Sequence, residues 1–157
     1  MIAMEEKTFF IRTQMFGLLE KLSENAVATW GKMNAQQALE HLADIFDVSS
    51  GKLTFDLVTP AEYLSKYRDF LYSEKEFREN TKAPESLIGV EPVAPKATNI
   101  AASLQHLQKS VDDFFRYFEL NPAEKTMHPV FGLLSFDEWI LLHYKHVRHH
   151  LRQFALL

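Results

Sequence analysis

Histidines gather near the carboxyl end of this chain, where they could bind a metal ion. Five of the seven histidines lie between residues 127 and 157, and four of these are His143, His146, His149 and His150. Imidazole nitrogens are common ligands of divalent metals, and residues three or four apart lie on neighbouring turns of a helix. The segment is therefore a candidate metal-binding helix. The alternative is a solvated helix end whose imidazoles interact with the helix dipole.

The spacing of these histidines leaves the choice of ligand pair open. His146 and His150 are four positions apart, His143 and His146 are three apart, and His149 follows His146 by three. One helix supplies two ligands readily, so a third must come from another element. His41 is the best candidate for the third ligand, because it lies beside the apolar stripe of a second predicted helix.

A site of three neutral imidazoles has a definite chemistry. It suits Zn²⁺, Ni²⁺ or Fe²⁺ and leaves coordination positions for water or substrate. Such a site implies Lewis-acid chemistry, which polarises a substrate oxygen or lowers the pKa of a bound water or thiol. A ligating histidine usually donates its other N–H to an acceptor. We therefore expect Glu40 or Asp44 near the His41 ring.

The other aromatic and histidine residues have simpler interpretations. A proline follows His128, which predicts a turn, and His143 is expected to pack beside the ligands. His106 falls outside the apolar seam of its helix and is expected at the surface. Trp30, His128 and Tyr144 are candidates for shaping a pocket, without a catalytic role.

Apolar periodicity and end signals define the elements that must position these residues. A capping box is predicted at Asn34 and Gln37 and another at Ser135 and Glu138. Between the helices, 52–58 is predicted as a short strand or extended segment. The proline-punctuated stretch 74–96 is predicted as an irregular excursion or lid. The predicted helices span residues 8–22, 34–50, 59–72, 98–120 and 135–154.

This order of elements predicts an all-α fold without strong strand pairing. The expected architecture is one domain, 1–157, built as a four-helix bundle. It has a long crossover between the second and third helices and a short extra helix within that crossover. A chain of this length buries a substantial core.

Composition excludes several classes of protein. The net charge of −4 argues against a nucleic-acid surface, since no basic patch is present to neutralise phosphates. No apolar run reaches the length of a membrane span, and the N-terminal residues are acidic where a signal peptide would be basic. The chain has no cysteine, which removes thiolate ligands and disulfides from consideration. We therefore expect a cytoplasmic protein.

The motifs resemble a known family. The His-Leu-x-Asp pattern at 41–44, after a tryptophan-containing loop, resembles the second helix of the DinB/YfiT-like metal-binding bundle superfamily. Residues 146–153, HVRHHLRQ, resemble its closing motif. The stretches 30–33 (WGKM), 128–132 (HPVFG) and 139–146 (Trp139, then Tyr-Lys-His) resemble a DinB-like subfamily of unknown function. The resemblance covers essentially the whole chain, with the motifs in the right order.

The resemblance implies a ligand set and a class of chemistry. Its metal ligands map to His41, His146 and His150, with His149 as a neighbour and Gln153 as a supporting or packing residue. It also implies a four-helix bundle and, commonly, a homodimer. Characterised relatives in the superfamily include thiol-dependent transferases and a thiol-dependent isomerase, in which the metal activates a low-molecular-weight thiol.

Two classes of function follow from the sequence. The first is a metal-dependent enzyme, either a transferase acting through an activated thiol or a hydrolase acting through an activated water. The second is a non-catalytic dimeric bundle with a structural metal. A small molecule is the expected partner of the enzyme. Neither a nucleic acid nor a membrane is expected as a partner.

Overall fold

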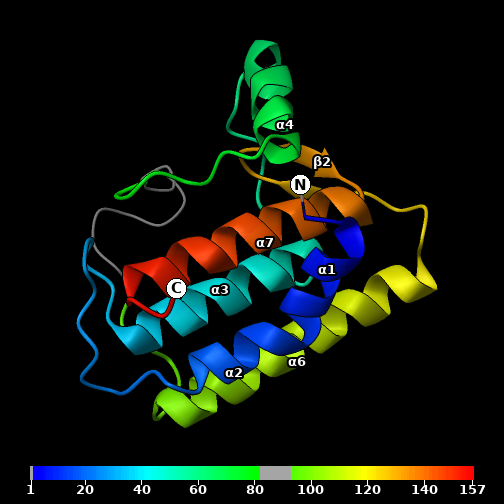
Figure 1. Cartoon of the computed structure of the whole chain (residues 1–157). Coiled ribbons are helices and arrows are strands. Elements are labelled where there is room, and N and C mark those ends of the chain that lie inside the picture. The colour runs from blue at the N-terminus through cyan, green and yellow to red at the C-terminus, as the bar shows by residue number, and fades with distance from the viewer. Residues whose placement is uncertain (1, 82–92) are drawn as a thin grey trace.

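A computed structural model describes residues 2–81 and 93–157, which are mostly helical with a small two-stranded antiparallel sheet (Figure 1). The N-terminal helical segment consists of α1 (Met4–Phe9), the π-helical turn η1 (Phe10–Gln14) and α2 (Met15–Leu19). The other elements are α3 (Ala35–Ser49), the 3₁₀ turn η2 (Ala61–Tyr63), α4 (Leu64–Tyr72), α6 (Ile100–Leu120), β1 (Thr126–His128), β2 (Gly132–Leu134) and α7 (Phe136–Gln153). The prediction of a mostly helical chain without strong strand pairing is confirmed, although the all-α class did not include this short strand pair.

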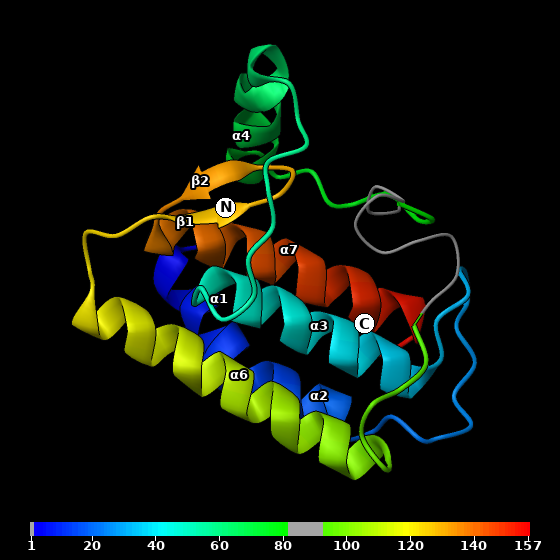
Figure 2. The same ribbon diagram turned by 180° about the vertical axis from the view of Figure 1, so that it is seen from behind.

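The long helices lie alongside one another. Helix α3 packs against both α6 and α7, and the N-terminal helical segment packs against α7 (Figure 1). Helices α3 and α6 run in the same direction, opposite to α7 (Figure 2). The connection from Ser49 to Ile100 therefore returns along the length of the helices, and it contains α4. The predicted irregular stretch 74–96 agrees with the structure at 74–81 and 93–96, while 82–92 lies outside the described residues.

Side-chain caps set the beginnings of the two helices that carry the histidine cluster. At α3 the Asn34 side chain accepts a hydrogen bond from the Gln37 N–H at 2.8 Å, and the Gln37 side chain accepts from the Asn34 N–H at 2.9 Å. Ser135 and Glu138 form the same reciprocal pair at the start of α7. Both capping boxes were predicted, and both satisfy N–H groups that a helix start leaves without a partner.

The first helix is longer at its start than the apolar pattern predicts. It begins at Met4 rather than at residue 8, with Glu5 and Glu6 in its first turn, and ends at Leu19 rather than at residue 22. Acidic side chains are favourable there because the helix dipole is positive at its N-terminus. Those polar residues do not belong to the buried stripe, so periodicity alone could not place them in the helix.

The small sheet closes one end of the helices. Strand β1 pairs antiparallel with β2, with Met127 opposite Leu133, and residues 129–131 form the turn that was predicted after His128. Trp139 Nε1 donates to Thr126 Oγ1 at 2.7 Å, and Thr126 Oγ1 donates to the Ser49 carbonyl at 2.8 Å. The hairpin therefore joins the end of α3 to the start of α7. Three-residue strands are too short to give a readable alternation.

The segment predicted as a short strand or extended chain, 52–58, forms no strand: the chain bends at 52–53, and 54–58 have no regular secondary structure. The Val58 N–H donates to the Pro129 carbonyl at 2.8 Å, and Thr59 Oγ1 donates to the Val130 carbonyl at 2.7 Å. These contacts hold the beginning of the long connection against the turn of the hairpin.

Helix α4 stands out from the body of the molecule above α7 (Figure 1). Arg68 forms an ion pair with Glu138, which is almost fully buried at the start of α7. The Tyr67 and Phe70 rings pack against the Phe131 ring of the hairpin. These contacts fix α4 and therefore position the segment that follows it. In the described residues, no helix is both long and apolar enough to cross a membrane.

His128 is a buried part of this hairpin rather than of a pocket. Its Nδ1 accepts hydrogen bonds from the N–H groups of Val130 at 3.0 Å and Phe131 at 3.1 Å. Its ring packs against Trp139, with 5.6 Å between ring centroids. Burial lowers the pKa of His128 to about 3. The imidazole is thus neutral in the folded protein at neutral pH.

We expect His128 to make the fold sensitive to acid. Its pKa is lower in the folded than in the unfolded chain, so its stabilising contribution is complete above about pH 6.5 and falls as the pH drops towards 3. The H128N variant keeps an acceptor for the two N–H groups but cannot titrate. Between pH 6 and 4.5, the slope of unfolding free energy against pH should be about 1.4 kcal/mol per pH unit smaller in H128N than in wild type.

Urea unfolding at a series of pH values, with a chelator present throughout, measures these slopes. His106→Asn is the matched control, because His106 is exposed, and it should keep most of the wild-type slope. Equal slopes in wild type and H128N would mean that His128 takes up its proton without unfolding.

Candidate metal centre

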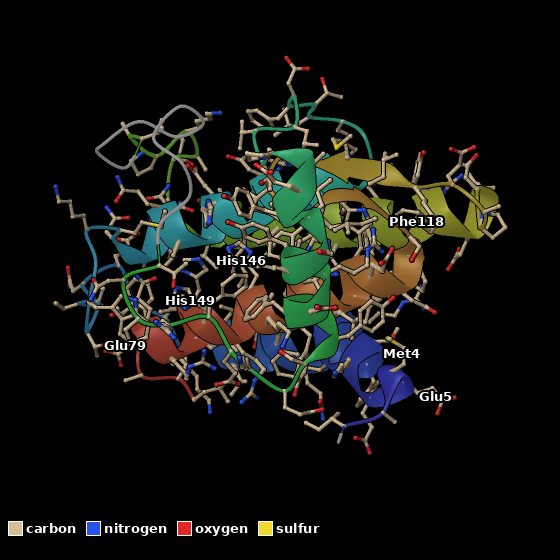
Figure 3. All side chains as sticks on the ribbon, turned by 90° about the horizontal axis from the view of Figure 1, so that it is seen from above. Met4, Glu5, Glu79, Phe118, His146 and His149 are labelled. Atoms are coloured by element: carbon tan, nitrogen blue, oxygen red, sulfur yellow. The ribbon has the colours of Figure 1, made fainter. Side chains whose placement is uncertain are left out.

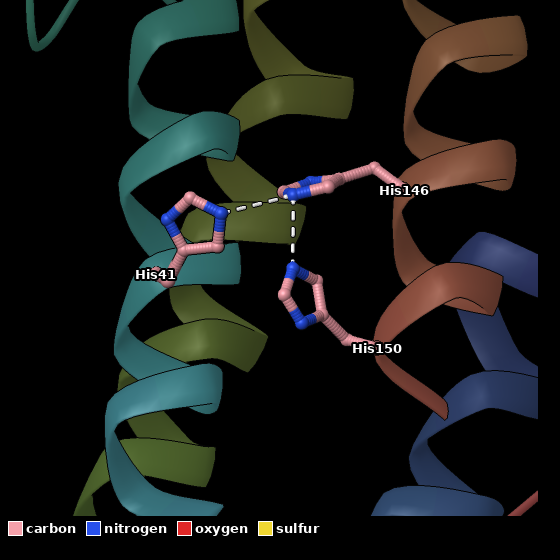
Figure 4. Close-up of side chains that lie close together, drawn as sticks. All are labelled: His41, His146 and His150. Atoms are coloured by element: carbon pink, nitrogen blue, oxygen red, sulfur yellow. Dashed lines mark hydrogen bonds between the residues drawn. The ribbon is translucent and has the colours of Figure 1, made fainter. Parts of the chain in front are cut away.

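Three imidazoles converge between α3 and α7. His41 projects from α3, and His146 and His150 project from α7 (Figure 4). The Nε2 atoms of His41 and His146 are 3.0 Å apart, and those of His150 and His146 are 3.2 Å apart. The ligand atoms of all three lie within 4.8 Å of one another. The structure thus brings together the three predicted ligands, and among the described residues no carboxylate joins this cluster.

Two contacts between α3 and α7 bracket the cluster. On one side the rings of Phe46 and His143 stack, with centroids 3.7 Å apart and planes 12° apart. On the other side, Ala35 and Ala38 form a small apolar cluster with Phe154, the C-cap residue of α7. Ala38 lies one turn before His41 and Phe154 one turn after His150, so this apolar cluster lies next to both histidines. Aromatic side chains from Phe46, His143 and Phe154 thus lie on both sides of the cluster.

Two of the three distances between ligand nitrogens, those from His146 to His41 and to His150, fit a common metal ion, and all three atoms lie within 4.8 Å of one another. With metal–nitrogen distances of about 2.0–2.1 Å, two ligand nitrogens lie about 3.3 Å apart in a tetrahedron and about 2.9 Å apart on an octahedral face. The separations of 3.0 and 3.2 Å fall between these values. Neutral imidazoles, without thiolates, suit Zn²⁺, Ni²⁺ or Fe²⁺. The residues present therefore fit the expected divalent metal.

Burial keeps the three imidazoles neutral, the form that binds a metal. The pKa of His41 is lowered to about 4, first by burial and then by the neighbouring His149. The pKa values of His146 and His150 are lowered well below the usual value, mainly by burial and next by the other histidines of the cluster. A free lone pair is therefore available on each ring at neutral pH.

The prediction that the Glu40 carboxylate lies beside the His41 ring is wrong. Its carboxylate instead accepts hydrogen bonds from the backbone N–H groups of Lys96 and Ala97, at 2.9 and 2.8 Å. Adjacent residues on a helix point about 100° apart, so Glu40 faces the returning connection while His41 faces α7. In the described residues, no hydrogen bond joins His41 to Asp44 either. Partial burial raises the pKa of Asp44.

The supporting contact that the structure does show belongs to His150. Its Nδ1 lies 2.7 Å from Gln153 Oε1, and Gln153 Nε2 donates to the Trp30 carbonyl at 3.0 Å. The loop before α3 is thereby attached to the end of α7. Spacing could place Gln153 one turn after His150, but its bond to Trp30 depends on a loop far away in the sequence.

His149 and two aromatic rings form a wall beside the cluster. The His149 ring centroid lies 5.6 Å from that of Trp30 and 5.9 Å from that of Phe77, and Phe77 also contacts His146. Viewed from above, His146 and His149 lie beside the segment that follows α4 (Figure 3). The Nδ1 atom of His149 is buried, with no hydrogen-bond partner in the described residues. Sequence reasoning missed Phe77, which no motif marks.

Basic residues of α7 hold this outer segment in place. Glu76 pairs with Arg148 at 3.0 Å and with Arg152 at 2.9 Å. Lys145 Nζ donates to the Ser73 carbonyl at 2.7 Å. A stripe of basic residues at 145, 148 and 152 facing acids at 74 and 76 is the signal that could have located the segment.

The remaining expected residues have other places. His143 is fully buried, and its Nε2 lies 3.0 Å from Ser49 Oγ, as expected for a packed residue. Tyr144 packs against Phe10, with ring centroids 5.3 Å apart. His106 is exposed, and its Nε2 lies 3.8 Å from Asp47 Oδ2. Trp30, His128 and Tyr144 were expected to shape a pocket. Of these three, Trp30 is the one whose ring contacts that of His149 beside the cluster.

Comparison with known proteins gives the family of the chain. Residues 5–156 match the model of a family described as "Protein of unknown function (DUF1569)". No curated protein and no solved structure matches the chain. Because the match covers nearly the whole sequence, including each histidine of the cluster, the chain belongs to the DUF1569 family.

Proposed function

We propose that His41, His146 and His150 bind one divalent metal ion, Zn²⁺, Ni²⁺ or Fe²⁺, and that the protein is a metal-dependent enzyme. The observation that carries this proposal is the convergence of three Nε2 atoms from two helices, at 3.0 and 3.2 Å, without a carboxylate. Three protein ligands leave coordination positions open, as in catalytic rather than structural zinc sites.

The favoured activity is a thiol-dependent transferase. When bound, the metal would act as a Lewis acid that lowers the pKa of a thiol or a water. The chain's own residues would hold the metal and enclose its partner. Trp30 and Phe77 offer apolar surface, and His149 offers a buried ring nitrogen. A hydrolase that uses water in place of the thiol is the alternative within the same class.

The family resemblance extends this proposal to the fold. We propose that the N-terminal helical segment, α3, α6 and α7 form a single-domain four-helix bundle of the DinB/YfiT type. Support comes from the long return between α3 and α6 and from the positions of the three histidines. A homodimer and a cytoplasmic location belong to the same proposal. Light scattering during gel filtration measures the oligomeric state.

A structural metal in a non-catalytic dimer is the competing function. It is favoured by one observation, which is that the cluster joins α3 to α7. The same two helices are also joined by the Phe46–His143 stack and by the contact of Ala38 with Phe154. The helices are thus held together beside the cluster on both sides, which favours a site that the fold does not require.

The first expected outcome concerns metal content. Purified protein supplemented with Zn²⁺ should carry about one ion per chain, measured by elemental analysis. His150→Ala should weaken Zn²⁺ binding by more than about 100-fold, because even the loss of a supporting partner costs 10–100-fold. His106→Ala is the control, since its ring is exposed and lies on α6. Wild-type protein without metal after supplementation would contradict the proposal.

The second expected outcome separates the enzyme from the structural alternative. Removing the metal with a chelator should leave the far-ultraviolet circular dichroism at 25 °C unchanged. The melting temperature should fall only by the amount that corresponds to the lost free energy of metal binding, which depends on the free metal concentration and on the Kd for the metal. Loss of helical signal on chelation at 25 °C would instead identify a structural metal, whose binding and folding are one process.

The third expected outcome distinguishes thiol from water chemistry. Adding 2-mercaptoethanol to the cobalt-substituted protein should produce a sulfur-to-cobalt charge-transfer band, because a coordination position is open to the thiol. The chain has no cysteine, so any such band must come from the added thiol. Ethylene glycol is the matched control without sulfur. An unchanged spectrum at saturating thiol would reject the thiol-dependent activity and leave the hydrolase.

A further inference from the structure

Gln153 connects the cluster to the loop around Trp30, and its contacts determine which nitrogen of His150 carries a proton. We propose that Gln153 is a positioning residue, which holds the His150 imidazole in the tautomer whose Nε2 lone pair faces His41 and His146. This inference rests on the proposed metal site for its purpose, although the tautomer itself does not depend on a bound metal.

The assignment follows from counting donors and acceptors. A backbone carbonyl only accepts, so the side of the Gln153 amide that lies 3.0 Å from the Trp30 oxygen must be its NH₂ group. The amide oxygen then lies on the other side, 2.7 Å from His150 Nδ1. An amide oxygen only accepts, so Nδ1 must donate. A neutral imidazole has one N–H, which leaves Nε2 with its lone pair directed at the cluster.

The loop before α3 is built to keep the amide in this orientation. Gln153 is 4% exposed, and its backbone carbonyl accepts from both the N–H and the hydroxyl of Thr29, at 2.8 and 3.1 Å. Gly31 has a φ of +75°, and a Cβ there would lie 3.0 Å from Gln153 Nε2. A glycine is therefore favoured both by the backbone conformation and by the close approach of the amide.

The tautomer of His150 matters because the Nε2 atoms of His41 and His150 both lie close to that of His146. His146 Nε2 lies 3.0 Å from the Nε2 of His41 and 3.2 Å from that of His150. If His150 carried its proton on Nε2, it would present a hydrogen where a metal ligand needs a lone pair. Fixing the proton on Nδ1 avoids that competing state, and the acceptor on Nδ1 also increases the basicity of the ligand.

Two substitutions separate positioning of the histidine from anchoring of the loop. Gln153→Met removes both hydrogen bonds at similar length. Gln153→Glu keeps an acceptor for His150 Nδ1 but has no N–H for the Trp30 carbonyl. Gln105→Met is the matched control, a glutamine replaced on the exposed surface of α6. The readouts are the ¹⁵N NMR tautomer of His150 in metal-free protein and the Kd for Zn²⁺.

We expect His150 to be protonated on Nδ1 in wild type and in Gln153→Glu, and to populate both tautomers in Gln153→Met. The Kd for Zn²⁺ should rise about 10–100-fold in Gln153→Met, the usual effect of losing a supporting partner, and stay within about threefold of wild type in Gln153→Glu. A merely structural role would weaken Zn²⁺ binding equally in both variants. That result, or unchanged Zn²⁺ binding in both, would overturn the inference.

The inference and the proposed function can fail separately. If wild-type protein binds no Zn²⁺, the proposed function fails, and the NMR measurement still decides the tautomer. His150 protonated on Nε2 in wild type would overturn the inference whatever the metal content. If Gln153→Met does not fold, Gly31→Ala replaces it. The methyl group added at residue 31 lies in the Trp30 loop and pushes the Gln153 amide away from its present position. It should raise the Nε2-protonated population, and an unchanged tautomer would overturn the inference.

Discussion

The close packing of α3 against α7 is the constraint on which the rest of the structure depends. Stacking of Phe46 on His143, at 3.7 Å, and packing of Ala38 with Phe154 set the separation of the two helices. Three imidazoles are thereby brought close together, with His150 buried and His41 and His146 half-buried. Burial disfavours their charged forms, and their Nε2 atoms are too close for each to find a separate hydrogen-bond partner. A cation that accepted lone pairs from all three would resolve that conflict.

Much of this arrangement could be predicted from the sequence because its causes are local. The capping boxes at Asn34 and Ser135 and the apolar stripes depend on residues a few positions apart, and α3 and α7 begin where they predict. The choice of the second ligand on α7 could not be predicted from local spacing. His149 and His150 both lie within one turn of His146, and only the position of α3 decides which faces His41. Spacing on one helix does not contain that information, and the family resemblance supplied it.

The parts that sequence reasoning missed depend on contacts between distant segments. The hairpin is connected to the helices by hydrogen bonds of Thr126 with Trp139 and Ser49, and strands of three residues are too short to show an alternating pattern. The Gln153 contact depends on Trp30, more than a hundred positions earlier. Glu40 or Asp44 was expected near the His41 ring, yet Glu40 is adjacent to His41 on the helix and its side chain therefore points about 100° away. Such contacts require the tertiary structure.

Helices and connections contribute different parts of the site. The two helices fix the ligand atoms, whereas the walls come from the Trp30 loop and from the segment that carries Phe77. Each connection is anchored to α7 separately, the first through Gln153 and the second through pairs of Glu76 with two arginines. Connections tolerate substitution better than packed helices do. Relatives that keep the histidines could therefore differ in the molecule they accept, since the walls can change while the spacing of α3 and α7 is kept.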